Sequence, residues 1–431
     1  MHTSRREFIQ ASALSAGAVA IGASGLLARQ GKASPFSHRA PLRILILGGT
    51  GFLGPACMEA ALAKGHHVTL FNRGRIESLR KERGRPSVVP EGVEVLFGNR
   101  DPNKTADDWK DDPRAAPPGQ HRDKAADSPK GLSQLEGKKW DAVIDTSGFF
   151  PRMAKASAEL LSPSIGQYLF ISTISVYKRN DVANADESAE LTTLADPTVE
   201  DFGAAFENYG GGKVLCEQAI EKACPGKTTV VRPGFIVGPR DNTRRYTFWP
   251  SRISKGGEMV VPGDPSDPIQ IIDVRDLAEW CVHLIENRTM GVFNATGPEK
   301  ELSIKALCEG TREGLGAKTN FTWIPLDFLE KQGLPSGAIF AAYPLYIPPV
   351  GESAGFHRVN VSKAVKAGLK FRPCSDTAKA TMDWIATLPE DAKKGVLPPA
   401  PGEPGSMTLS QERETEIIRA WNESQKDPAK K

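Results

Sequence analysis

Residues 43–54 read RILILGGTGFLG, a short apolar strand that runs directly into a glycine-rich turn and the start of a helix. The unbroken apolar run at 43–47 is typical of a strand covered on both faces, as in a parallel sheet. Glycines at positions 48, 51 and 54 permit a tight turn, a close approach of the backbone to a pyrophosphate, and close packing of helix on strand. The start of the helix supplies N–H groups and a positive dipole end, so this stretch predicts a dinucleotide-binding turn.

Strand-like and helix-like segments alternate from Leu42 onward, which is the signature of βαβ units on a parallel sheet. Strands are expected at residues 43–47, 68–71, 93–97, 142–145, 168–172, 229–232 and 291–295. Residues 273–286 have the amphipathic pattern of a helix with Asp273 near its N-cap. We therefore expect an α/β fold, a Rossmann-like doubly wound parallel sheet over residues 42–240. A smaller C-terminal α+β substrate-binding region is expected over residues 241–400, with residues 270–297 returning to the first domain.

Two segments lack this pattern. Residues 101–139 are rich in Asp, Lys, Pro and Gly and have little periodic apolar content, so we expect a flexible insertion there. Residues 401–431 are polar, and we expect a tail that contains a helix over residues 409–421.

The N-terminus contains SRREFIQ at residues 4–10, followed by a weakly hydrophobic stretch over residues 11–28. Paired arginines before such a stretch resemble a twin-arginine export signal. We expect residues 1–33 to be this signal, read by the twin-arginine export machinery, and the processed protein to be periplasmic with no stable membrane span. An uncleaved N-terminal anchor is the alternative.

Composition excludes several classes of protein. The chain has 431 residues, of which 39% are hydrophobic and 25% charged, an ordinary globular mix that excludes disordered and collagen-like chains. The formal net charge of +3 resides in residues 1–33, so the remainder is neutral and offers no charge pattern for nucleic acid. The six cysteines are scattered, which indicates buried hydrophobic residues rather than a disulfide scaffold or a metal site. His66 and His67 are expected in an exposed turn.

The second strand ends in Asn72 followed by Arg73. Dinucleotide sites often place an acid here to bind the adenosine 2′-hydroxyl. A guanidinium suits a 2′-phosphate better, so the cofactor is predicted to be NAD or NADP, with NADP modestly favoured. The alternative for Arg73 is a solvated surface side chain.

Tyr209 and Lys213 are spaced by four residues, which places them on one face of a helix. Free tyrosine titrates near pH 10, so it is a poor proton shuttle unless its anion is stabilised. An ammonium group nearby lowers that pKa, and Tyr209 could then exchange a proton with a carbinol.

Five motifs occur in one order: GGTGFLG at 48–54, ISTISVY at 171–177, YGGGK at 209–213, RPGFIVGP at 232–239 and PIQIIDVRDLA at 268–278. Over roughly residues 42–300 the chain thus resembles the extended short-chain dehydrogenase/reductases, also called the NAD-dependent epimerase/dehydratase family. The resemblance implies that Thr173 is the catalytic hydroxyl, Tyr209 the general acid/base and Lys213 the ribose-binding, pKa-lowering residue. The chain departs from the family after the third strand, where GNRD at 98–101 replaces the usual Gly-Asp.

The loop motif and the resemblance together predict the residues that bind the cofactor. They are Gly48, Thr50, Gly51, Phe52, Leu53, Gly54, Asn72, Arg73, Asn99, Arg100, Thr146, Ser147, Gly148, Lys213, Pro233, Gly234 and Ile236.

The segment RDNTRRYTFW at residues 240–249 leaves the sixth strand at its carboxyl end, where ligands bind in open α/β sheets. Its guanidiniums and aromatic rings could hold an anionic or sugar substrate, and the alternative is a surface loop with solvated cations. The predicted substrate residues are Arg244, Arg245, Trp249, Arg252 and Gln270. By resemblance, Asp273 also lies near the substrate pocket.

These features predict an exported NAD(P)-dependent enzyme of epimerase/dehydratase type that acts on a secondary alcohol of a sugar or sugar-like substrate. Outside the cytoplasm there is no obvious pool of free dinucleotide or nucleotide sugar. We therefore expect a tightly bound dinucleotide, regenerated in each turnover, and a sugar that is not nucleotide-linked. A simple dehydrogenase or reductase and a catalytically idle nucleotide-binding relative are the alternatives, and a homodimer is left open.

Overall fold

The computed structural model describes residues 40–82, 84–103, 131–203, 206–403, 406 and 408–426. Residues 41–431 form one compact unit. The predicted export signal at 1–33 and most of the predicted insertion, residues 104–130, lie outside the described residues.

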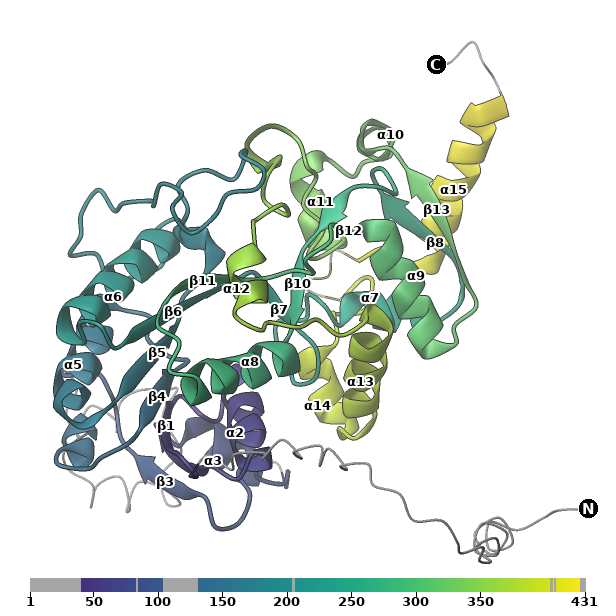
Figure 1. Cartoon of the computed structure of the whole chain (residues 1–431). Coiled ribbons are helices and arrows are strands. Elements are labelled where there is room, and N and C mark those ends of the chain that lie inside the picture. The colour runs from purple at the N-terminus through teal and green to yellow at the C-terminus, as the bar shows by residue number, and fades with distance from the viewer. Residues whose placement is uncertain are drawn as a thin grey trace, which may run out of the picture. The chain divides into compact units, whose positions relative to one another are not determined.

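A parallel seven-stranded sheet forms the centre of this unit, in the order β11-β6-β5-β4-β1-β2-β3 (Figure 1). Its strands are β1 (Arg43–Leu47), β2 (His67–Asn72), β3 (Glu94–Phe97), β4 (Ala142–Asp145), β5 (Gln167–Ile171), β6 (Thr228–Pro233) and β11 (Gly291–Ala295). The chain order therefore reverses between β1 and β4, which makes this pair the topological switch point. The predicted α/β fold is confirmed, and the ends of the predicted strands are shifted by at most one residue.

Helices cover both faces of the sheet. The helices α2 (Leu53–Ala63) and α8 (Val274–Glu286) lie on one face, and α5 (Pro151–Leu161) and α6 (Tyr209–Ala223) lie on the other (Figure 1). Successive side chains of a strand point to opposite faces, so Ile44 and Ile46 pack toward α2 and α8, whereas Leu45 and Leu47 pack toward α5 and α6. This double burial is the reason for the unbroken apolar run in β1. The helix α3 (Arg75–Glu82) follows β2.

The C-terminal region contains three short sheets and its own hydrophobic core. The strand pairs are β7 (Phe235–Val237) with β10 (Ile271–Asp273), β8 (Gly257–Pro262) with β13 (Thr319–Ile324), and β9 (Pro268–Ile269) with β12 (Leu302–Ser303). Its helices are α7 (Phe248–Ser254), α9 (Ile304–Leu315), α10 (Leu326–Lys331), α11 (Ser336–Ala342), α12 (Ser362–Lys366), α13 (Cys374–Ala386), α14 (Glu390–Val396) and α15 (Gln411–Lys426). Short 3-10 helices occur as η2 (Gly131–Leu135), η3 (Ser162–Ser164), η4 (Ile174–Val176) and η5 (Gly351–Ser353).

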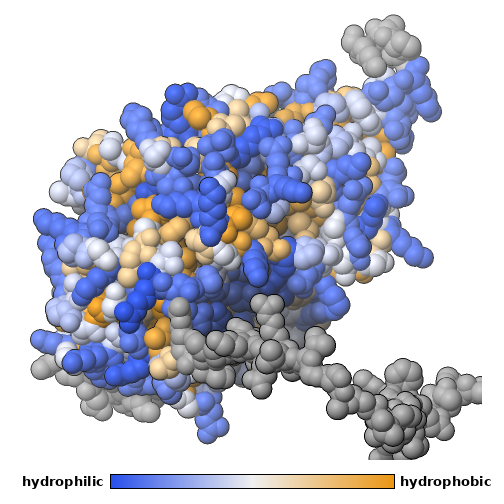
Figure 2. Space-filling view, viewed as in Figure 1, coloured by the Kyte–Doolittle hydropathy of each residue, from blue (hydrophilic) through white to orange (hydrophobic). Residues whose placement is uncertain are grey.

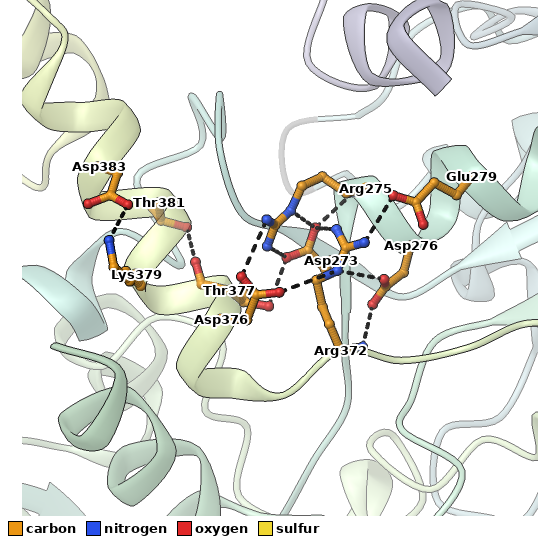
Figure 3. Close-up of polar contacts among 10 residues, drawn as sticks. All are labelled: Asp273, Arg275, Asp276, Glu279, Arg372, Asp376, Thr377, Lys379, Thr381 and Asp383. Atoms are coloured by element: carbon orange, nitrogen blue, oxygen red, sulfur yellow. Dashed lines mark hydrogen bonds and ion pairs between the residues drawn. The ribbon is translucent and has the colours of Figure 1, made fainter. Parts of the chain in front are cut away.

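An ionic cluster at the start of α8 joins this helix to α13 (Figure 3). Asp273 caps α8 by accepting the Arg275 N–H at 2.8 Å, as predicted, and also accepts from the Arg275 guanidinium at 3.0 and 2.7 Å. The Thr377 hydroxyl donates to the same carboxylate at 2.8 Å. Arg372, just before α13, forms an ion pair with Asp276 at 2.9 Å. The Asp273 side chain therefore connects two helices.

The cysteines and one of the two adjacent histidines are buried. All six cysteines are free thiols, and five of them are buried. The expectation of exposure is wrong for His66, which is 5% exposed because its ring bonds to the Leu42 N–H and the Glu286 carboxylate.

No described helix has both the length and the apolar character that a membrane span requires. On the face seen in Figure 2, hydrophobic residues reach the surface in patches scattered among hydrophilic ones.

Candidate active site

A cavity of about 980 Å³ lies at the carboxyl ends of the central strands. Its lining includes residues at or just after the ends of β1, β2, β4, β5 and β6, such as Gly48, Asn72, Thr146, Ser172 and Gly234. These loops meet around the switch point of the sheet, where ligands bind in open α/β folds.

The glycine-rich turn after β1 needs glycine for two different reasons. Gly48 has φ +90°, and a Cβ there would lie 2.7 Å from both Thr146 Oγ1 and Ser147 Cβ. A Cβ at Gly54 would lie 2.4 Å from the Gly48 carbonyl, so this glycine allows α2 to pack on the turn. Phe52, the N-cap residue of α2, makes no side-chain cap hydrogen bond, which leaves the first N–H groups of the helix for a ligand. The turn thus fits a pyrophosphate.

Asn72 at the end of β2 has a side-chain amide that is available to a ligand in the cavity. Both of its side-chain amide atoms are buried, and neither has a hydrogen-bond partner among the described residues. Unpaired buried polar atoms are costly, and ribose hydroxyls would satisfy an amide of this kind. Arg73 and Arg75 line the same end of the cavity. The residues present therefore fit a dinucleotide.

The first turn of α6 brings the two predicted proton-handling groups together. Tyr209 is the first residue of α6, and Thr173 is the N-cap of η4, where its hydroxyl accepts the Ser175 N–H at 3.1 Å. Burial raises the pKa of Tyr209 above its ordinary value and outweighs two opposing influences, a hydrogen bond with Thr173 and the positive charge of Arg245. Without a ligand, the phenol therefore holds its proton at neutral pH.

Lys213 lies one turn further along α6 and is 2% exposed. Its ammonium donates to the carbonyls of Gly148 and Ile171, both at 2.8 Å, and lies 4.0 Å from the ring centroid of Phe170. Burial lowers the pKa of Lys213 to about 8. In this arrangement Lys213 joins the ends of β4 and β5, while Arg245 is the cation that acts on Tyr209.

Arg100 lies at the border of the cavity, and its guanidinium forms a buried ion pair. Although it borders the cavity, its guanidinium is buried and donates to both carboxylate oxygens of Asp145, at 2.5 and 2.7 Å, and to Ser157 at 2.9 Å. Tyr168 donates to the same carboxylate at 2.8 Å. Through these bonds of its Nη atoms Arg100 supports the end of β4, and its role in cofactor binding stays a prediction.

Only one of the five predicted substrate residues lines the cavity. Arg245 does, whereas Trp249 is fully buried and donates from Nε1 to the Pro344 carbonyl at 2.6 Å. The Arg252 guanidinium binds Glu414 of α15 at 2.8 Å, and the Gln270 amide exchanges hydrogen bonds with the Val359 backbone at 2.9 Å.

Arg244 and Asp273 also lie outside this lining. The Arg244 guanidinium donates to the backbone carbonyls of Lys394 and Gly395 at 3.0 and 3.3 Å. Asp273 is committed to the cluster at the start of α8. Of the five predicted substrate residues, the structure thus places Arg245 alone in this lining.

The other predicted residues divide between the cavity wall and the layer behind it. Gly54 packs behind the turn, and Gly148 contributes the carbonyl that binds Lys213. Those in the lining are Gly48, Thr50, Gly51, Phe52, Leu53, Asn72, Arg73, Asn99, Thr146, Ser147, Thr173, Tyr209, Lys213, Pro233, Gly234 and Ile236.

An aromatic wall beside Tyr209 was not predicted. Phe202 stacks between Phe150 and Phe206, with ring centroids 5.3 and 5.6 Å away, and forms this wall together with Phe149. The Phe-Phe pair after the fourth strand was the sequence signal that could have indicated this wall.

Behind Thr173, a buried ion pair supports the end of β5. Arg232 binds Glu217 at 2.6 and 3.0 Å, and Ser172 donates to the same carboxylate. The sequence signal that could have indicated this ion pair was one charged residue in a buried strand, Arg232, and one in a helix packed on the sheet, Glu217.

Comparisons with known proteins agree with this architecture. Residues 152–295 match the model of the NAD dependent epimerase/dehydratase family. The chloroplast stem-loop binding protein of 41 kDa b from Arabidopsis thaliana is 24% identical over 280 residues, which cover 64% of this chain and 63% of that protein. The chain thus spans less than two thirds of the length of that relative.

Two solved structures share the fold. The Bordetella bronchiseptica enzyme WbmH, in complex with NAD+, has a TM-score of 0.53 and 14% identity over 80% of this chain and 99% of that chain. The UDP-glucose 4-epimerase of Thermotoga maritima, with UDP-glucose, has a TM-score of 0.50 and 15% identity over the same shares of the two chains. At these identities the likeness concerns the fold alone.

Proposed function

Because residues 152–295 match the NAD dependent epimerase/dehydratase family, we propose that the chain is an NAD(P)-dependent enzyme of epimerase/dehydratase type acting on a secondary alcohol of a sugar or sugar-like compound. One observation carries the proposal. Tyr209 and Thr173 lie beside each other in the same cavity that is lined by the glycine-rich turn and by the unpaired amide of Asn72. A proton-exchanging pair and a dinucleotide cradle thus share one space.

The chain's own residues have distinct tasks in this reaction. A nicotinamide dinucleotide held by the glycine-rich turn would supply the chemistry of hydride transfer. Tyr209 takes the hydroxyl proton of the substrate when the carbinol is oxidised and gives it back when the carbonyl is reduced. The Thr173 hydroxyl, held by the Ser175 N–H, donates to the substrate oxygen and orients it. Lys213 joins the ends of β4 and β5 through the carbonyls of Gly148 and Ile171 and so holds this wall of the cavity in place.

We also propose that the protein is exported through the twin-arginine route with its dinucleotide already bound. Support comes from SRREFIQ at residues 4–10 and from the ability of this route to move folded proteins. A cofactor carried in this way must be regenerated in each turnover, as in epimerisation or dehydration. The substrate is then a sugar without a nucleotide. NADP is the preferred dinucleotide in this proposal because Arg73 and Arg75 line the cavity close to Asn72, and guanidiniums suit a 2′-phosphate.

Mass spectrometry of small molecules released from the purified, exported protein tests these proposals. A stoichiometric dinucleotide that survives extensive dilution is the expected result, and its mass distinguishes NAD from NADP. A protein that loses its nucleotide on simple dilution contradicts tight binding. Tyr209→Phe should retain the nucleotide and lose turnover, because only the proton-exchanging oxygen is removed.

A second candidate is a binding protein without catalysis. The observation that favours it is the similarity to a stem-loop binding protein over 64% of the chain. Under this alternative, Tyr209→Phe leaves the protein's binding properties unchanged and no turnover is found with any alcohol. A dehydrogenase or reductase that receives electrons from a partner would instead show net oxidation or reduction of the bound dinucleotide.

A further inference from the structure

Arg245 lines the cavity, and its charge, unlike that of Arg100 and Arg152, is not matched by a carboxylate among the described residues. Arg100 is paired with Asp145, and Arg152 is paired with Asp101 at 2.6 Å and with Glu200. Within the described part of the chain, Arg245 has no carboxylate at ion-pair distance. The single hydrogen bond of its guanidinium to a described residue runs from Nε to Thr243 Oγ1, at 3.2 Å.

The guanidinium of Arg245 is oriented by its surroundings. Its central carbon lies 4.9 Å from the ring centroid of Phe235, so one face of the guanidinium is covered by an aromatic ring. Thr243 holds Nε, and Thr243 is in turn anchored to Asp241 by hydrogen bonds of 2.8 and 2.6 Å. With a face and Nε engaged, the edge that carries Nη1 and Nη2 remains for a planar, bidentate acceptor.

The guanidinium of Arg245 shares the cavity with Tyr209 and Thr173 and acts on Tyr209 through its charge. Arg245, Tyr209 and Thr173 line the same cavity. The charge of Arg245 lowers the pKa of Tyr209, and burial lowers the pKa of Arg245 itself, against the opposing influence of Asp241. A half-buried guanidinium without a counterion is unfavourable, and a ligand anion would compensate it.

We propose that Arg245 binds a carboxylate of the substrate, so that the substrate is a small acidic secondary alcohol, such as a uronic or aldonic acid, whose carbinol faces Tyr209. This inference rests on the proposed function, because it assigns a substrate class to the same site. Phe149, Phe150 and Phe202 of the aromatic wall line the cavity and supply the surface on which the apolar face of such a ring or chain packs. Since the acid neutralises Arg245, its binding raises the pKa of Tyr209, and the two events are coupled.

Calorimetry on the dinucleotide-loaded full chain tests the inference with two matched pairs of probes. These are D-glucuronate against D-glucuronamide, and D-gluconate against D-gluconamide, which differ only in charge at one group. We expect the wild type to bind at least one acid about tenfold or more tightly than its amide. Arg245→Gln should abolish that preference, and Arg245→Lys should restore part of it, because an ammonium keeps the charge without the bidentate edge.

Arg244→Gln is the matched control, because Arg244 is adjacent but binds the backbone carbonyls of Lys394 and Gly395. It should bind acids as the wild type does. Equal binding of acids and amides, a preference that persists in Arg245→Gln, or no binding of either acid overturns the inference. The dinucleotide content of each preparation distinguishes a wrong substrate class from a wrong proposed function. A loaded protein without acid preference refutes only the substrate class, whereas a protein that cannot be loaded refutes the proposed function.

Discussion

Gly210 contacts the Ser175 carbonyl so closely that a Cβ at position 210 would lie 2.2 Å from that oxygen. Gly211 is similarly constrained, since its Cβ would lie 2.6 Å from Leu194 Cδ2. These glycines are in the first turn of α6, where their cost to helix stability is small. Gly210 allows the start of α6 to approach η4, so that Tyr209 is held beside Thr173, and Gly211 allows the helix to approach Leu194.

Gly210→Ala should therefore separate the two proton-handling groups. Backbone must shift to accept the Cβ, and we expect turnover to fall by about tenfold or more while the dinucleotide remains bound. The control is Gly212→Ala, because a Cβ at 212 meets no atom within 4 Å. That variant should keep its activity and gain up to about 1 kcal/mol of stability. Equal turnover in the two variants would contradict this account.

Lys213 should make the stability of the cofactor-free protein depend on alkaline pH. Burial lowers the pKa of Lys213 from 10.5 to about 8 in the folded state, so the cost of the buried ammonium is present below pH 8. That cost is relieved as the pH rises from 8 to 10.5, where the folded state binds fewer protons than the unfolded chain. Urea unfolding at pH 7 and pH 10 should show the wild type gaining stability relative to Lys213→Met. A difference between the two proteins that is independent of pH contradicts the buried ammonium.

His357 should contribute to acid sensitivity. Its Nδ1 accepts the Gln270 N–H at 3.0 Å, and burial lowers its pKa from 6.5 to about 4. The stability that depends on the neutral ring is present above pH 6.5 and is lost as the pH falls from 6.5 to 4, by up to about 3 kcal/mol. Denaturant titrations should therefore show a smaller loss in His357→Gln than in the wild type over this range. His67→Gln, at an exposed site, should lose stability as the wild type does.

Arg73 and Arg75 should decide between the two dinucleotides. Replacing both with Gln is expected to weaken NADP binding by about tenfold to a hundredfold, because the 2′-phosphate loses its cations, and to leave NAD binding unchanged. Asn72→Asp should also weaken NADP binding relative to NAD binding, because it places a carboxylate beside the 2′ position. Fluorescence titrations with each nucleotide measure both effects. An equal loss of NAD and NADP affinity in the double variant shows that these arginines do not contact the 2′-phosphate.

The sheet could be predicted well because its signals are local. The apolar run of β1, the glycines at 48 and 54, and the N-cap Asp273 each act through neighbouring residues, and all three are found as expected. The substrate side could not be predicted in the same way. Trp249 and Arg252 are in a segment with no regular period, and their burial depends on Pro344 and Glu414, which are far away in the sequence.

The sequence by itself determined the order of the elements, the phosphate-binding turn and the presence of a tyrosine at the start of α6, since backbone sterics and hydrophobic periodicity are encoded within short windows. Tertiary structure alone decided which of several arginines carries an available charge. Arg100 and Arg252 find carboxylates in distant segments, whereas Arg245 finds the face of Phe235 and the cavity. The reason is physical: whether a cation is neutralised depends on which groups the folded chain places within a few ångströms of it.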